Sequence, residues 1–208
     1  MDPLGKTELL SSYDRHLREF GDKPQAVRWT PEGQRRRYEN LLRVAGDLSG
    51  KALLDFGCGK GDFYSFLTEE GFSPEYCGID INEGLISLAK RKFPDVEFIA
   101  LDIEEDEFGR HFDSIIVCGV FNLRVAGIDE TMRNILKRLF RLCRESLHIN
   151  VLSYYVPRRT VELFYVKPEE IMKFAAAELS SKVTLMLDGE DIYLSVFKQV
   201  LPLPSKIA

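Results

Sequence analysis

The sequence has few histidines and cysteines, and their spacing is not that of a metal site. It contains three histidines and four cysteines, Cys58, Cys77, Cys118 and Cys143. No two cysteines form a C-x-x-C pair, and no histidine lies at ligand spacing from one, so the sequence predicts no metal site. Because unpatterned thiols are typical of a reducing compartment, we also expect a cytoplasmic protein.

Long apolar runs and a surplus of basic residues are missing as well. No hydrophobic stretch approaches the roughly 18 residues that a membrane-spanning helix needs. The opening MDPLGKTELL lacks the basic and apolar regions of a signal peptide. The formal net charge is −5, whereas a nucleic-acid-binding domain usually carries a basic excess or stripe. We therefore expect neither a membrane nor a nucleic acid as a partner.

The length and composition of the chain are those of a single globular domain. The chain has 208 residues, of which 45% are hydrophobic and 29% charged. Helical spacing of apolar residues over 6–20 and 31–46 predicts two helices ahead of the first strand. We expect residues 1–48 to form an N-terminal helical cap that makes one compact unit with a domain over 49–208.

After the cap, short apolar runs alternate with helical patterns. The alternation predicts a mostly parallel sheet with helices on both faces, an α/β fold of Rossmann-like type. The last two runs, at 183–187 and 192–197, are joined by too few residues for a helical crossover, so we expect antiparallel neighbours there. The other predicted strands are 51–56, 76–81, 96–101, 112–118 and 147–152, and the helices between or after them are 61–70, 83–93, 128–143 and 168–179.

The strongest local signal is the segment LLDFGCGKGDF at residues 53–63. An apolar strand runs into three glycines at alternate positions, Gly57, Gly59 and Gly61, with Cys58 between the first two, and a helix follows. Glycine lets the backbone turn tightly and approach a ligand closely. Ligands of open α/β sheets bind at the carboxyl ends of the strands, so this loop predicts a ligand-binding site.

The charge of this loop distinguishes between ligands. A dinucleotide-binding loop has the pattern G-x-G-x-x-G, whereas this one is G-x-G-x-G and follows an acidic residue, Asp55. A pyrophosphate here would meet Asp55 and Asp62 with only Lys60 to offset them, which is unfavourable on Coulomb grounds. A ligand with a cationic amine and a sulfonium suits the loop better.

Two further carboxylates follow the next strands. Asp80 ends the second strand, where a carboxylate can accept hydrogen bonds from ribose hydroxyls, as it also does in NAD-binding folds. Asp102 follows the third strand and is placed to accept a bond from an adenine amino group, with Ile81 and Ile103 flanking the ring. The alternative for Asp102 is a helix N-cap, because aspartate is a favoured cap.

The motifs LLDFGCGKG, GIDI and ALDIEE resemble those of class I S-adenosylmethionine-dependent methyltransferases, over residues 51–198. The resemblance implies S-adenosylmethionine as cofactor and a seven-stranded sheet whose last strand is antiparallel, in agreement with the strand pattern. It also implies roles for individual residues. The methionine moiety would face the glycine loop, which comprises Asp55, Gly57, Cys58, Gly59 and Gly61. Asp80 would hold the ribose, and the adenine would lie against Ile81, Asp102 and Ile103. Cys118 and Gly119 would lie beside the sulfonium.

The flanks resemble a narrower group, small stand-alone bacterial methyltransferases of unassigned substrate. The shared segments are residues 26–29 (AVRW), 37–38, 154–155 and 163–165, together with Gln34. We expect the acceptor to lie between the loops 119–122 and 153–159, under a roof of N-terminal residues.

Candidates for contacts inside this site come from both ends of the chain. We expect Trp29 in the roof to pack on the cofactor or the acceptor. The sequence does not single out a catalytic residue, and the candidates for that role are Asn122, Asn150 and Tyr154. Methyl transfer needs a base only if the acceptor must lose a proton early. His148 lies inside the fifth strand and indicates a buried sheet residue rather than a catalytic base.

The sequence therefore predicts methyl transfer from S-adenosylmethionine to a small-molecule acceptor by in-line displacement. Two alternatives stay open: an NAD-dependent oxidoreductase, although no Tyr-x-x-x-Lys relay is present, and a non-catalytic S-adenosylmethionine-binding module. The N/DPPY tetrapeptide of amino-methylating DNA enzymes is absent after the fourth strand, where GVFN stands at 119–122.

Overall fold

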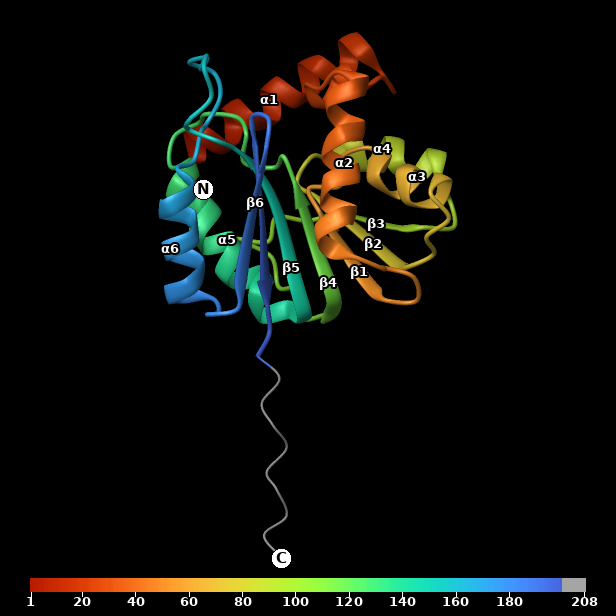
Figure 1. Ribbon diagram of the computed structural model, residues 1–208. Coiled ribbons are helices and arrows are strands. Elements are labelled where there is room, and N and C mark those ends of the chain that lie inside the picture. Colours follow the sequence, from red (N-terminus) through yellow and green to blue (C-terminus); the bar gives the residue numbers. More distant parts are fainter. Residues whose placement is uncertain (200–208) are drawn as a thin grey trace, which may run out of the picture.

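A seven-stranded sheet forms the centre of the protein, in a computed structural model that describes residues 1–199 (Figure 1). The strand order is β3-β2-β1-β4-β5-β7-β6, and β7 runs antiparallel to both of its neighbours. The fold predicted from the strand pattern is thus confirmed, including its antiparallel strand. The strands are β1 (Ala52–Phe56), β2 (Glu75–Asp80), β3 (Glu97–Ala100), β4 (Phe112–Cys118), β5 (Cys143–Leu152), β6 (Val183–Asp188) and β7 (Asp191–Phe197).

Helices cover both faces of the sheet. One face packs against α2 (Pro31–Ala45), α3 (Asp62–Glu69) and α4 (Glu83–Lys92), and the other against α5 (Ile128–Leu142) and α6 (Pro168–Glu178). Helix α1 (Pro3–Phe20) crosses above the edge at which the parallel strands end (Figure 1). A 3-10 turn, Pro24–Val27, joins α1 to α2.

The N-terminal helices begin and end at the residue types that helix physics favours. The Asp2 carboxylate accepts the backbone N–H of Leu4 at 2.9 Å, and Thr30 caps α2 by accepting the N–H of Gly33 at 3.1 Å. Both helices end at a glycine with positive φ, Gly21 and Gly46. These local signals account for the close agreement between predicted and observed helix ends.

Strand β5 is longer than predicted. It begins at Cys143, directly after the last residue of α5, and Cys143 pairs with Phe112 of β4. The predicted start was residue 147, because Arg144 and Glu145 break the apolar pattern. Their side chains are exposed, and they lie where the register between β4 and β5 shifts, between the Phe112–Cys143 and Ser114–Ser146 pairs.

The two faces bury different kinds of side chain. On the α2–α3–α4 face, the rings of Tyr38, Phe63 and Phe66 lie 5.1 to 6.2 Å apart between centroids. On the other face, α5 buries aliphatic residues such as Leu136 and Leu139, both 0% exposed, against β4 and β5. Burying such side chains is the main stabilising contribution to a fold of this kind.

Helix α2 packs directly on the sheet and is bonded to it by polar side chains. Arg37 Nε donates to Asp191 Oδ1 at 2.9 Å, and Arg36 lies 3.4 Å from the same carboxylate, whose side chain is 0% exposed. Asn40 Nδ2 donates to Asp188 Oδ2 at 2.8 Å. Of the two helices expected to form a cap, α1 therefore lies across the strand ends, while α2 is fastened to β7.

His148 belongs to a buried polar chain inside the sheet. Its Nδ1 lies 2.8 Å from Ser195 Oγ and its Nε2 lies 2.9 Å from Ser146 Oγ, which in turn lies 3.0 Å from Ser114 Oγ. The ring is 0% exposed, and burial lowers the pKa of His148 from 6.5 to about 4. The position of this residue agrees with the interpretation drawn from the sequence.

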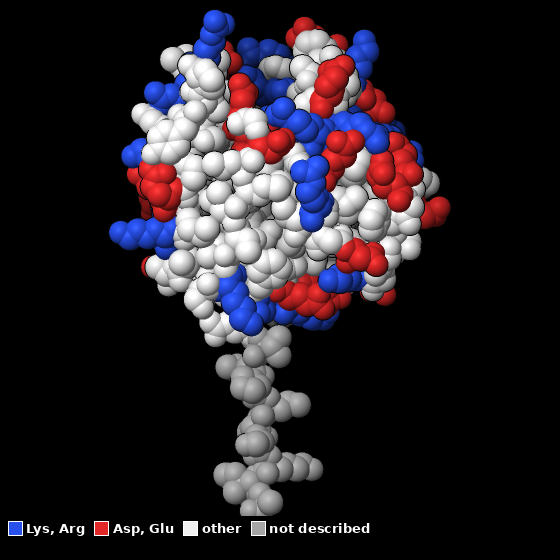
Figure 2. Space-filling view, in the orientation of Figure 1, with Lys and Arg blue, Asp and Glu red and all other residues white. Residues whose placement is uncertain are grey.

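Charged side chains gather along the upper rim of the face that Figure 2 shows. Acidic and basic groups alternate there, while the middle of that face is largely uncharged. Within residues 1–199, none of the helices combines the length and the apolar character needed to cross a bilayer.

We predict that Asp191→Ala lowers the free energy of unfolding by about 3 kcal/mol, because it leaves Arg37 partly buried and unpaired. Glu70→Ala is the matched control, since Glu70 pairs with Arg35 at the surface and such pairs contribute about 0.2–1 kcal/mol. Urea denaturation measures both. Equal effects of the two substitutions would contradict the anchoring role of Asp191.

We predict that His148 makes folding pH-dependent. Because its folded pKa, about 4, lies below its unfolded value of 6.5, the unfolded state binds a proton first as pH falls. The stability contribution is complete above pH 6.5 and decreases down to about pH 4, by about 3 kcal/mol in total.

Denaturation of the wild type and His148→Gln between pH 4 and 8 measures this contribution. The free energy of unfolding of the variant must be subtracted from that of the wild type at each pH. The raised pKa of Asp55 makes stability change with pH in the opposite direction, and it does so in both proteins. The stability difference between the two proteins should narrow as the pH falls. A difference that stays constant with pH would contradict the titration of His148.

Candidate functional site

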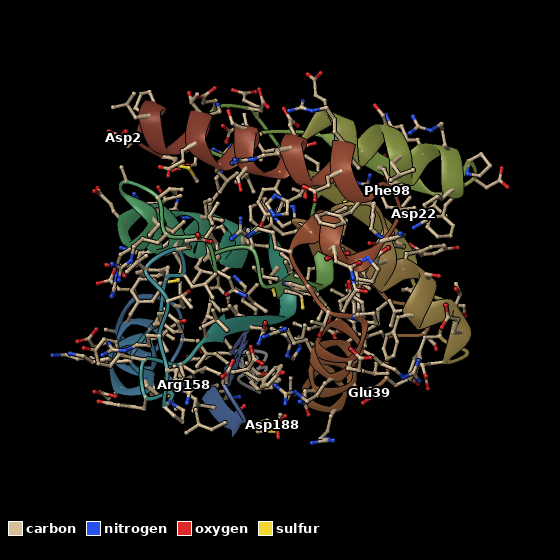
Figure 3. The ribbon with its side chains drawn as sticks, turned by 90° about the horizontal axis from the view of Figure 1, so that it is seen from above. Asp2, Asp22, Glu39, Phe98, Arg158 and Asp188 are labelled. Atoms are coloured by element: carbon tan, nitrogen blue, oxygen red, sulfur yellow. The ribbon has the colours of Figure 1, made fainter. Side chains whose placement is uncertain are left out.

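A deep cavity opens at the carboxyl ends of β1, β2 and β4, below α1. Figure 3 looks down on this edge, with α1 along one side of the view. The cavity has a volume of about 1090 Å³, counting its open mouth. Of the predicted cofactor residues, those that line it are Trp29, Asp55, Gly57, Cys58, Gly59, Asp80, Ile81, Asp102, Ile103, Cys118 and Gly119.

The loop after β1 has positive φ at all three of its glycines, and two of them, Gly57 and Gly59, line the site. Gly57 has φ 74°, and a Cβ there would lie 2.3 Å from Val120 Cγ2. Gly59 has φ 55°, and its N–H donates to Asp80 Oδ2 at 2.9 Å. Gly61 is different: it precedes α3, packs against Phe98 and is not part of the cavity wall. The first two glycines thus bring bare backbone to the cavity.

Acidic side chains predominate in the cavity wall. The titratable side chains that line it are Asp55, Asp62, Asp80, Asp102 and Glu104 against Lys60, with two tyrosines and two cysteines. Lys60 Nζ lies 2.6 Å from Asp62 Oδ1 and 3.2 Å from Asp22 Oδ1, so its charge is already compensated. Within residues 1–199, no cluster of three or more His, Cys, Asp or Glu is arranged to hold a metal ion. Glu104, Asp102 and Asp62 are likewise paired with cations. Among residues 1–199, no ion pair involves Asp55 or Asp80, and their part of the wall favours an organic cation.

Asp55 is the most deeply buried of these acids. Its side chain is 2% exposed, and Tyr76 Oη donates to its Oδ2 at 2.5 Å. Burial raises the pKa of Asp55 to about 7, the Tyr76 hydrogen bond opposes this, and the nearby Asp80 and Asp62 carboxylates add to it. The carboxyl is therefore only partly ionised near neutral pH, and a cation placed beside it would favour the ionised form.

Asp80 is held in place by backbone donors at the end of β2. The N–H of Asn82 donates to Oδ1 at 2.8 Å, opposite the Gly59 bond to Oδ2. Burial raises the pKa of Asp80, while these backbone hydrogen bonds lower it. With both oxygens anchored, the carboxylate is preorganised to accept further bonds from hydroxyls in the cavity.

Asp102 begins a turn and does not cap a helix, because no helix is formed between β3 and β4; its role toward adenine stays a prediction. Its Oδ1 accepts the N–H of Glu104 at 2.9 Å, as a turn cap does, and it still lines the cavity beside Ile103. Its Oδ2 lies 2.6 Å from Lys6 Nζ of α1. Lys6 was not singled out in the sequence, since only the fold brings the two residues together.

Trp29 closes the cavity next to the end of β4. A Cβ on Gly119, which has φ 67°, would lie 2.3 Å from Trp29 Cζ2, so glycine allows this contact. The Arg37 guanidinium carbon is 5.3 Å from the centroid of the indole, and Tyr38 is 5.8 Å away. Tyr13 of α1 lies in the same wall, and burial, with Asp80 nearby, raises its pKa to about 12.

A second, smaller cavity adjoins the first. Its volume is about 490 Å³ counting its mouth, and four residues line both cavities: Tyr13, Val27, Trp29 and Gly119. The remaining wall is formed by Arg28, Arg37, Asn122, Leu123, Leu152, Leu163 and Glu190. The loop after β4 and the predicted roof residues thus line the second cavity, as the sequence predicts for the acceptor site. None of residues 153–159, the other wall that the sequence predicts, lines it; Leu152 and Leu163 stand there instead.

The three candidate catalytic residues do not lie together. Asn122 lines the second cavity. Asn150 is 0% exposed and its Nδ2 donates to Asp191 Oδ1 at 3.2 Å, away from both cavity walls. Tyr154 stacks under Arg159, 3.8 Å from ring centroid to guanidinium carbon, on an exposed loop. Arg158, labelled in Figure 3, is exposed on the same loop.

Comparison with known families finds a methyltransferase domain in the central part of the chain. A family model described as a methyltransferase domain matches residues 53–146, which include the glycine loop, β2 and the end of β4. The methyltransferase-like protein Rv1506c of Mycobacterium tuberculosis is 24% identical over 156 residues, covering 71% of this chain and 92% of that protein. The malonyl-[acyl-carrier protein] O-methyltransferase of Acetivibrio thermocellus is 34% identical over 41% of this chain and 32% of its own length.

Solved structures share the whole fold. Magnesium protoporphyrin IX methyltransferase of Synechocystis, with S-adenosylhomocysteine bound, superposes with a TM-score of 0.70, covering 93% of this chain and 100% of that chain at 17% identity. The methyltransferase-domain match over residues 53–146, the named relatives and the shared fold together support a class I S-adenosylmethionine-dependent methyltransferase.

Proposed function

We propose that the chain transfers the methyl group of S-adenosylmethionine to a small-molecule acceptor by in-line displacement. One observation carries the proposal: the acidic, glycine-lined cavity meets a second cavity across Trp29 and Gly119. Two ligands bound side by side would therefore face each other at the end of β4. That juxtaposition is what a direct transfer between two substrates requires.

The residues of the first cavity fit the cofactor. Asp55 and the bare backbone of Gly57 and Gly59 would hold the cationic amino-acid portion, Asp80 the ribose, and Asp102 with Ile103 the adenine. When bound, the cofactor supplies a methyl group activated by a cationic sulfur. The acidic wall stabilises that positive charge better than water-exposed residues would, because the site is largely enclosed.

The residues of the roof would orient the acceptor and exclude water. Trp29 and Tyr13 line both cavities, and Gly119 lets the indole lie directly on the backbone after β4. The raised pKa of Tyr13 keeps its hydroxyl protonated, so it serves as a hydrogen-bond donor at neutral pH. Alignment and exclusion of water are the main requirements of methyl transfer, and neither needs a dedicated base.

We predict that S-adenosylmethionine and S-adenosylhomocysteine bind the purified protein and quench the fluorescence of Trp29, the only tryptophan in the chain. Asp80→Asn should weaken binding at least tenfold, since a charge-assisted hydrogen bond contributes about 1.5–3 kcal/mol. Calorimetry measures the affinities. Asp95→Asn, an exposed aspartate, is the matched control and should bind like the wild type.

Binding of NAD with no affinity for either methyl compound would refute the proposal. A turnover assay distinguishes an enzyme from a non-catalytic binding module. We expect the labelled methyl group of the cofactor to appear on one or more members of a metabolite panel. Cofactor binding with no transfer to any small molecule in the panel would favour the module.

We predict that cofactor affinity rises with pH between 6 and 7.5. Because the pKa of Asp55 is about 7 in the free protein, a cationic ligand must displace a proton below that pH, at a penalty approaching tenfold per pH unit. Calorimetry at several pH values measures the slope. Asp55→Asn should bind more weakly with a flat profile, whereas Asp95→Asn should keep the wild-type slope. An unchanged slope in Asp55→Asn would refute this assignment.

A further inference from the structure

The second cavity contains a buried hydrogen-bond acceptor that has no partner. Asn122 is 8% exposed and lines this cavity, and its Oδ1 makes no hydrogen bond within the protein. Leaving such an oxygen unpaired costs about 1–3 kcal/mol, so its retention at a cavity wall calls for a ligand that donates to it.

The backbone around Asn122 is pinned on both sides, which fixes where its amide lies. Its carbonyl oxygen accepts the N–H of Phe164 at 2.9 Å, from the loop after β5, and its own N–H donates to the Gly119 carbonyl at 3.4 Å. Leu123 and Leu163 form a further bridge between the same two loops. The Nδ2 end of the amide lies beside Gly119, which lines both cavities, and the unpaired Oδ1 is the other end of the same amide.

From this arrangement, and resting on the proposed function, we infer that the acceptor carries a hydroxyl or amine nucleophile whose proton is donated to Asn122 Oδ1. The methyl group is then attached to oxygen or nitrogen. The hydrogen bond orients the lone pair of the nucleophile toward the first cavity. That lone pair forms the bond to the methyl carbon while the carbon–sulfur bond breaks and leaves its electrons on sulfur. The proton of the nucleophile passes to water.

The rest of the second cavity suits a small polar molecule. Arg28 holds its guanidinium there through a 3.1 Å bond to Ser12 Oγ and a 2.9 Å pair with Glu162, which is 70% exposed. Arg37 in the same wall is committed to Asp191. Leu123, Leu152 and Leu163 supply apolar contacts. A compact acceptor with one protic group and an apolar body matches this lining.

Binding to protein saturated with S-adenosylhomocysteine tests the inference. The probes are small hydroxylated and aminated aromatic and aliphatic acids, each paired with an isostere that has methyl in place of the hydroxyl or amine. We expect donor-bearing probes to bind at least fivefold more tightly than their isosteres, and those that react to be methylated on oxygen or nitrogen. A panel without that preference, or methylation on carbon alone, would overturn the inference.

Three variants localise the effect to Asn122. Asn122→Leu should abolish the preference and lower kcat/KM at least tenfold, while Asn122→Asp, which keeps an accepting oxygen, should retain the preference. Asn134→Leu on the exposed face of α5 is the matched control and should behave like the wild type. If Asn122→Leu still binds donor-bearing probes more tightly than their isosteres, another residue accepts the hydrogen bond and the inference is overturned.

The affinity of each variant for S-adenosylhomocysteine shows whether its first cavity is intact. Unchanged affinity together with a lost preference is the expected result for Asn122→Leu. If the wild type itself fails to bind the cofactor, the proposed function fails; if it binds the cofactor but shows no preference between donors and isosteres, only the inference about Asn122 fails.

Discussion

The site depends on the way in which the glycine loop is tied to the end of β2. The N–H groups of Gly57 and Cys58 both donate to the Ile79 carbonyl, at 2.8 and 3.0 Å, and the next amide donates to the Asp80 carboxylate at 2.9 Å. These bonds turn the chain sharply away from the sheet, which needs positive φ at Gly57 and Gly59. One short turn therefore opens the first cavity and also fixes the carboxylate that faces it.

The second structural requirement is the roof, which α2 and the segment before it place over the sheet edge. The buried carboxylate of Asp191 binds Arg37, and the Arg37 guanidinium lies over the Trp29 ring. Gly119 then allows the indole to touch the backbone after β4. A packing interaction on one face of the sheet thus determines the position of a residue that both cavities share.

The two cavities differ in chemistry in a way that suits two different ligands. The first has an excess of carboxylates, of which Asp55 is the most buried, and the second has arginines, leucines and the unpaired oxygen of Asn122. An organic cation is stabilised in the first, and a neutral molecule with a protic group suits the second, where both arginines are paired with carboxylates and Glu190 is also present. Contact between the cavities at Trp29 and Gly119 is what makes a transfer reaction the simplest interpretation of the pair.

The sequence by itself determined the α/β class, the succession of strands and helices along the chain, and the carboxylates and glycines that line the first cavity. Such features are local: alternation, turn chemistry and charge within a few residues of a strand end. Only the tertiary structure separated Asn122, at a cavity, from Asn150, bound to Asp191, and placed α2 on the sheet. Those outcomes follow from contacts between loops and strands far apart in the chain, which the pairing of β4, β5 and β7 brings together.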